Sequence, residues 1–259
     1  MNETKVIYLK EDIKLEDTIL IVGLPGVGNV GKLVARNLIE ELNAEKIIEI
    51  YSPFFPPQVA INKDSTVDLV NNELYFCNVN GKNVIILIGD HQSISTKGQY
   101  ELCGLYLDIA IKYGVSRIYS LGGFPTGELE HEDKVIGAVN DIKLIEELKS
   151  KEVIFKENEP GGGIVGAAGL ILGLAKFKGI EAACLMGVTS GYIVDPKSAQ
   201  SLLKIVDNIL GIKTGSESLE ARAKEMEVII EKLTEIEQQR QQQPLKLINK
   251  NDEDLSYIG

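Results

Sequence analysis

The sequence is poor in the residues that build metal clusters and disulfide frameworks. It has no tryptophan, two histidines and three cysteines in 259 residues, and aromatic residues make up 6%. Two histidines and three scattered cysteines do not make a metal cluster, so we expect no bound metal. We interpret Cys77, Cys103 and Cys184, each embedded in an apolar run, as small core residues of a protein in the reducing cytoplasm.

Positive charge and long apolar runs are also scarce. Lys and Arg number 27 against 38 Asp and Glu, which gives a formal net charge of −11. An acidic surface matches neither a phosphate backbone nor an anionic lipid surface, so we expect no nucleic-acid or membrane partner. The longest mainly apolar stretch, residues 161–178, is glycine-rich and interrupted by lysine, too short for a comfortable membrane span. The first residues contain no apolar run, so we expect no signal peptide.

What the sequence does contain is a regular alternation of strand and helix patterns. Hydrophobic residues make up 44% and charged residues 25%, a globular composition that excludes a disordered or collagen-like chain. Short apolar runs ending at glycine predict buried strands, and apolar residues at helical spacing predict helices between them. An Asn-Gly pair at 80–81 predicts a tight hairpin turn. The pattern predicts an α/β fold with a mainly parallel sheet and flanking helices. We expect strands at 18–22, 46–51, 73–78, 83–88, 117–121 and 181–186, and helices at 29–42, 98–113, 161–178 (after a glycine-rich start) and 195–210.

The composition changes after Gly215, where a segment rich in Glu, Lys and Gln begins. We therefore divide the chain into an α/β domain at 1–215, a helical arm at 216–243 and a flexible tail at 244–259. Apolar residues in the arm alternate spacings of four and three, as in a coiled-coil or bundle seam. A lone helix with so narrow a stripe needs a partner face, either on the domain itself or on another subunit, and we favour another subunit. The seam consists of Leu219, Ala223, Met226, Ile230 and Leu233.

A glycine motif follows the first buried strand of the domain. Gly26, Gly28 and Gly31 fit G-x-G-x-x-G between a strand and a helix, and Lys32 follows. Such glycines let backbone N–H groups approach a pyrophosphate at a helix N-terminus, which makes these four residues candidates for an anion site. The alternative interpretation, which we favour, is a tight strand-to-helix turn whose glycines allow close packing. In a phosphate loop the next residue would be Ser or Thr, but it is Leu33.

Four other segments have chemical interpretations, and each also has a structural one. The small-residue run at 161–169 suits an anion nest or a tightly packed helix. Thr189 stands where a nucleophile elbow would have serine. Asp90 and His91 follow a strand at the edge where α/β active sites lie, but no nucleophile accompanies them. The carboxylates at 128–133 suit a solvated acidic loop or a weak cation site. We assign no catalytic residue and no cofactor.

Taken together, several segments resemble the proteasome assembly chaperone family, and specifically its archaeal homologues. No single motif carries the match, but the ordered set covers about residues 15–210. The matching segments are 26–31, 52–57 (Ser-Pro-Phe-Phe-Pro-Pro), 121–127 (Leu-Gly-Gly-Phe-Pro-Thr-Gly), 161–179, 185–187 and 191–199.

The resemblance implies a nucleoside-phosphorylase-like α/β fold without an established enzymatic activity, homo-oligomerisation, and binding to the α-ring of the core proteasome. Family members of this kind dock a C-terminal hydrophobic–tyrosine–X tail between α-subunits. The corresponding residues here are Leu255, Tyr257, Ile258 and Gly259. The motif places tyrosine next to last, whereas this chain has Ile258 there, with Leu255 offering the hydrophobic side chain one place early.

We therefore expect a cytoplasmic, homo-oligomeric chaperone or activator of the core proteasome that binds α-subunits through its tail. The alternative is a nucleotide- or phosphate-binding enzyme of phosphorylase-like fold that uses the turn from Gly26 to Gly31. A third possibility is a scaffold held by the helical arm with no proteasome role. Several tails on one oligomer would bind about 10²–10⁴-fold more tightly than one, provided that they dock together.

Overall fold

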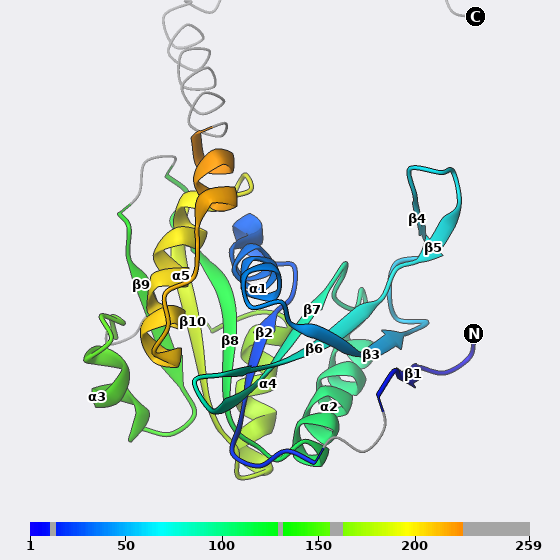
Figure 1. Cartoon of the computed structure of the whole chain (residues 1–259), viewed down its shortest axis with the longest axis horizontal. Coiled ribbons are helices and arrows are strands. Elements are labelled where there is room, and N and C mark those ends of the chain that lie inside the picture. The colour runs from blue at the N-terminus through cyan, green and yellow to red at the C-terminus, as the bar shows by residue number, and fades with distance from the viewer. Residues whose placement is uncertain (11–13, 129–131, 156–162, 225–259) are drawn as a thin grey trace, which may run out of the picture.

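The computed structural model describes residues 1–10, 14–128, 132–155 and 163–224. Its centre is one eight-stranded sheet in the order β1-β3-β6-β7-β2-β8-β10-β9 (Figure 1). A separate two-stranded sheet pairs β4 with β5. The strands are β1 (Lys5–Tyr8), β2 (Thr18–Gly23), β3 (Glu45–Tyr51), β4 (Val59–Ile61), β5 (Val67–Leu69), β6 (Asn72–Val79), β7 (Lys82–Gly89), β8 (Val115–Pro125), β9 (Val135–Val139) and β10 (Glu181–Thr189).

The four middle strands, β7, β2, β8 and β10, run parallel, as the alternation of strands and helices predicts. Antiparallel strands extend the sheet on both sides, with β6, β3 and β1 on one and β9 on the other. The β6–β7 hairpin turns at Asn80 and Gly81, which have φ values of 50° and 82°. The predicted α/β fold is therefore confirmed, with a parallel centre and antiparallel edges.

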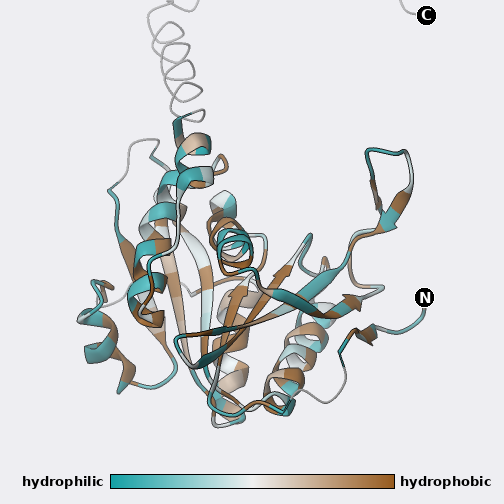
Figure 2. Ribbon diagram, viewed as in Figure 1, coloured by the Kyte–Doolittle hydropathy of each residue, from teal (hydrophilic) through white to brown (hydrophobic). Residues whose placement is uncertain are grey.

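Helices cover both faces of the sheet. They are α1 (Val30–Glu41), α2 (Thr96–Lys112), α3 (Leu144–Lys149), α4 (Ala167–Phe177) and α5 (Pro196–Leu210). Successive residues of a strand face opposite sides, so in β2 Leu20 packs in the cluster that includes α2 and α4, while Ile21 packs in the cluster that includes α1 and α5. Figure 1 shows α1 and α5 on the near face, and Figure 2 shows hydrophobic residues concentrated along the central strands.

Several elements extend beyond the sequence-based expectations. Strand β8 continues through Gly122 and Gly123 to Pro125, beyond its expected end at residue 121. The sequence patterns did not predict β1, β4, β5, β9 or α3. Helix α5 begins as expected, because the Asp195 side chain accepts a hydrogen bond from Ser198 N and Pro196 occupies the first turn. No helix within the described residues is long and apolar enough to span a membrane.

The described part of the arm, helical from residue 217 to residue 224, packs back on the domain. Leu219 is 2% exposed and belongs to the core cluster beneath α1 and α5, and Ala223 is 8% exposed. Their own chain therefore covers these two residues, and the contact of the seam with another subunit stays a prediction. The other three seam residues, Met226, Ile230 and Leu233, lie outside the described residues, as do the boundaries of the tail.

Candidate functional site

The glycine turn lies at the carboxyl end of β2, in the middle of the parallel strands. A short 3-10 segment, Val27–Asn29, connects β2 to α1. Gly28 and Asn29 both adopt the left-handed conformation, with φ values of 61° and 51°. In open α/β sheets this edge is where ligands bind, so the contacts of the turn decide between the anion-site and packing interpretations.

The glycines of the turn and its surroundings lie against protein atoms. A Cβ built on Gly31 would lie 2.2 Å from the carbonyl oxygen of Leu121. One on Gly23 would lie 2.2 Å from the Cβ of Ala35, and one on Gly123 would lie 2.4 Å from the carbonyl oxygen of Val27. Real Cβ atoms do not approach other atoms so closely. These glycines therefore allow α1 to pack directly on β8, which supports the packing interpretation.

One carbonyl group and the lysine of the turn have partners within the chain. The carbonyl oxygen of Gly28 accepts a hydrogen bond from Asp195 N at 2.9 Å, and a Cβ on Gly28 would lie 2.9 Å from Oγ1 of Thr189. Lys32 Nζ lies 3.5 Å from a carboxylate oxygen of Asp90. The lysine that would attract a phosphate is thus paired with an acid, which lowers its attraction for a second anion.

The space beside the turn is small. A cavity of about 60 Å³ lies among Gly26, Val27, Gln92 and Met186, whereas small-molecule sites are about 300–1,000 Å³. The Gln92 amide crosses this region, donating to the carbonyl oxygen of Pro25 at 2.6 Å and accepting from Ala167 N at 2.9 Å. Ala167 is the first residue of α4, so the Gln92 side-chain oxygen accepts a hydrogen bond from a backbone N–H at the start of that helix. The helix follows the glycine-rich run that begins at residue 161.

The other candidate catalytic residues are held in structural contacts. His91 contacts the Gln58 amide through Nε2 at 2.5 Å, and its neighbour Asp90 pairs with Lys32. Thr189 is the fully buried last residue of β10 rather than an exposed nucleophile. Within the described residues, no three or more His, Cys, Asp or Glu side chains are grouped as a metal site.

Glu49 follows the glycine motif at about the spacing at which dinucleotide-binding folds place the acid that binds the ribose. The sheet topology, however, keeps Glu49 away from the turn. It belongs to β3, which β6 and β7 separate from β2. Glu49 accepts hydrogen bonds from Lys46 and Tyr51, and Glu73 on β6 also pairs with Lys46. Burial disfavours the charge of Lys46, but these carboxylates outweigh it and raise the pKa of the lysine. The group is a cross-strand charge cluster.

The three cysteines are buried and free. Desolvation raises the pKa of the Cys77 and Cys184 thiols to about 11 and that of the Cys103 thiol to about 12. A thiol acts as a nucleophile or metal ligand in its deprotonated form. Their environment is that of core side chains, as the sequence analysis proposed.

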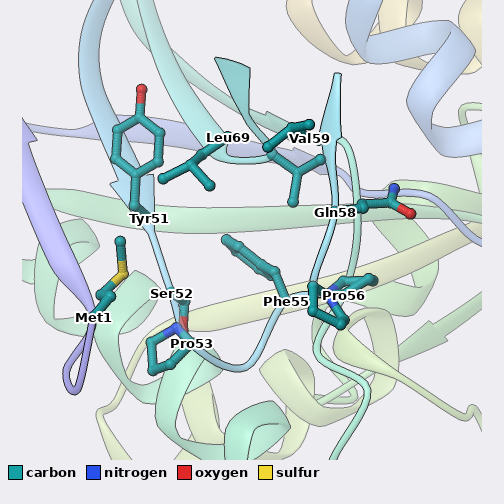
Figure 3. Close-up of a pocket in the computed structure, with 11 residues that line it drawn as sticks. Met1, Tyr51, Ser52, Pro53, Phe55, Pro56, Gln58, Val59 and Leu69 are labelled. Atoms are coloured by element: carbon teal, nitrogen blue, oxygen red, sulfur yellow. The ribbon is translucent and has the colours of Figure 1, made fainter. Parts of the chain in front are cut away.

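A second and much larger hollow lies beside the β4–β5 hairpin. It has a volume of about 500 Å³ and is lined by the proline-rich loop after β3, the base of the β4–β5 hairpin and Met1. In Figure 3, Val59 and Leu69 lie on one side of this pocket, and Phe55, Pro56 and Pro53 lie on the other. No side chain that lines it is Asp, Glu, Lys or Arg. We call it the proline groove.

The β4–β5 hairpin projects from the body beside this groove (Figure 1). Val59 pairs with Leu69 and Ile61 pairs with Val67, so these four apolar side chains share one face of the hairpin. Their exposed fractions are 47%, 54%, 77% and 58% respectively. The sequence patterns did not predict this hairpin. The signal was weak, since β4 is Val-Ala-Ile and only β5, Val-Asp-Leu, alternates apolar and polar residues.

The predicted partner-binding tail, Leu255, Tyr257, Ile258 and Gly259, lies outside the described residues. The base of the arm that leads to it is anchored to the domain. Asn37 on α1 donates to the carbonyl oxygen of Gly215 at 2.9 Å, and Glu41 accepts from Gly215 N at 2.9 Å. Thr214 donates from its backbone N–H and its hydroxyl to Asp207 on α5. The arm therefore leaves the body from a fixed point between α1 and α5.

Comparisons with known proteins place this geometry in context. The model of the PAC2 family matches residues 20–234. An uncharacterised protein of Methanocaldococcus jannaschii is 41% identical over 260 residues, which covers 98% of each chain.

Two solved structures from Pyrococcus furiosus are similar over nearly the whole chain. PbaB, described as an archaeal proteasome activator, is 42% identical with a TM-score of 0.84, covering 90% of this chain and 100% of that one. PbaA, described as an archaeal homolog of proteasome-assembly chaperone, is 26% identical with a TM-score of 0.71, covering 92% and 98%.

Proposed function

The chain belongs to the PAC2 family, and from this we propose that it is a non-enzymatic, homo-oligomeric chaperone or activator of the core proteasome in the cytoplasm. The observation that carries the proposal is the similarity to PbaB, a proteasome activator, at 42% identity over 90% of the chain. The resemblance found in the sequence points the same way. The contacts of Gly28 and Gly31 support a structural role for the glycine turn, because a Cβ on either would lie within 3 Å of protein atoms.

We propose that contact with the α-ring is made by the C-terminal residues. A chain end carrying a carboxylate suits capture by backbone donors or a lysine, while Tyr257 fills an apolar pocket. One such peptide binds weakly, because ordering it costs conformational entropy. Several copies on one oligomer would bind together with much greater avidity. The arm, fixed to α1 and α5 at its base, gives each tail a defined starting point.

A binding experiment tests this proposal. Core particles immobilised through a β-subunit are incubated with the full-length chain and with a chain lacking residues 257–259. We expect the full-length chain to be retained and the shortened one to be lost, with unchanged thermal denaturation of the body. Equal retention of both would refute the role of the tail, and retention of neither would refute the proteasome partner.

A further inference from the structure

The hairpin and the proline groove together form a surface that the described residues of one chain do not cover. Val59 and Leu69 both line the groove and begin the apolar face of the hairpin. Ile61 and Val67 continue that face outward, at 77% and 58% exposure. The result is an unbroken apolar surface that runs from a concave groove onto a projecting arm.

The hairpin is built as a separate, ordered element. Its two strands pair with each other and with no strand of the main sheet. At its end Asn62 bonds Thr66 and Asp68, and Thr66 bonds Asp64, so the polar groups satisfy one another. An isolated two-stranded hairpin is at best marginally stable in water. Its apolar face therefore needs a cover that is present whenever the chain is folded.

We propose that this cover is a second copy of the same chain, with the hairpin of each copy lying in the proline groove of the other. The convex and the concave partner are both present on one chain, as a two-fold interface requires. This inference rests on the homo-oligomer part of the proposed function and assigns the surface that makes the contact.

The distribution of charge on the chain agrees with a second copy as the partner. Each copy carries a net charge of −11, so two copies repel each other over most of their surfaces. The proline groove has no lining side chain that is Asp, Glu, Lys or Arg, and the four residues of the hairpin face are apolar. Contact between this face and the groove of another copy buries no charged side chain of either surface.

Cross-linking between two cysteine variants tests the contact. The native cysteines are all buried, so an engineered thiol is the reactive one. Ile61→Cys places a thiol on the hairpin, and Pro53→Cys places one at the groove. The variants are mixed, one of them labelled with nitrogen-15, and treated with a short bismaleimide. We expect a covalent dimer containing one copy of each, and no such dimer when Ile142→Cys replaces Ile61→Cys. Ile142 is 79% exposed and lies before α3, at the other edge of the sheet.

Sedimentation of two aspartate variants gives an independent readout. Ile61→Asp combined with Val67→Asp should weaken self-association at least tenfold, while Ile142→Asp leaves it unchanged. If wild-type protein associates but the hairpin variant associates equally well and no mixed dimer forms, the interface is wrong and the proposed function stands. If wild-type protein is a monomer at every concentration, the homo-oligomer itself is wrong.

Discussion

Two apolar regions of this molecule, the carboxyl ends of the central strands and the hairpin with its groove, differ in what covers them. At the strand ends, Gly31 lies against Leu121 and the remaining space is about 60 Å³. Beside the hairpin, a groove of about 500 Å³ is open and the neighbouring apolar side chains are exposed. Enzymes of α/β fold leave the first kind of place open for ligands. In this chain the helix α1 packs closely on β8 at that place, and apolar side chains are exposed at the hairpin instead, the kind of surface through which proteins bind one another.

The largest effect on stability is expected for a substitution in the closely packed glycine turn. In Gly31→Ala the added Cβ would meet the Leu121 carbonyl at 2.2 Å, and we expect a loss of about 3 kcal/mol in the free energy of unfolding. Urea denaturation measures it. The matched change Gly104→Ala in α2, where a Cβ meets nothing within 4 Å, should stabilise by about 0.5–1 kcal/mol through helix propensity. Equal effects of the two changes would show that the turn is not closely packed.

A substitution of Leu219 tests whether its side chain is covered by its own chain or by another subunit. Its side chain is 2% exposed in the core cluster of α1 and α5, so Leu219→Ala should cost about 2–3 kcal/mol by leaving a cavity. Because the covering atoms belong to the same chain, the loss should be independent of protein concentration. Denaturation curves at protein concentrations a hundredfold apart check this. A loss that vanishes on dilution would return Leu219 to a seam between subunits.

A smaller effect is expected at the anchor of the arm. Asn37 is 3% exposed, donates to the carbonyl oxygen of Gly215 and accepts from the Ser218 hydroxyl at 3.3 Å. Asn37→Ala removes both bonds and should cost about 1–2 kcal/mol. Faster amide hydrogen exchange at residues 215–220 would accompany it. Ser201→Ala, which removes one exposed bond to the Lys197 carbonyl, serves as the control and should change stability by less than about 0.5 kcal/mol.

The smallest response is expected in the reaction of the native cysteines with a thiol reagent. Burial raises the pKa of Cys77 and Cys184 to about 11 and that of Cys103 to about 12. At pH 8 the thiolate fraction is therefore about 0.1% or less, and folded wild-type protein should leave Ellman's reagent unreacted. All three thiols should react after unfolding. Rapid reaction of a native thiol would place a cysteine at an open surface and remove the basis of the cross-linking design.

The sequence was sufficient for elements whose pattern and end signals agree. Strand β2, helix α1 and the β6–β7 hairpin follow from apolar periodicity bounded by glycine or Asn-Gly. Helix α5 follows from Asp195 and Pro196 at its start. Strands β4 and β5 escaped prediction because three residues give little periodicity.

The site was less predictable, because spacing records which residues are small or apolar but not what covers them. Gly26, Gly28 and Gly31 have the same spacing in a phosphate-binding turn and in a packed one. The positions of Leu121 and Thr189, distant in the chain, distinguish the two. Likewise the spacing of Leu219 and Ala223 indicates an apolar stripe, but the packing of Leu219 in the core cluster of α1 and α5 could not be inferred from it.

Core-particle peptidase activity tests the central claim most directly, because one assay compares the tail with the glycine turn. The rate of fluorogenic peptide hydrolysis is measured with wild-type chain, with a chain lacking residues 257–259, and with Lys32→Gln, which removes the cation of the turn. We predict that wild-type and Lys32→Gln raise the rate equally and that the shortened chain has no effect. Loss of the effect in Lys32→Gln with full activity of the shortened chain would contradict the account.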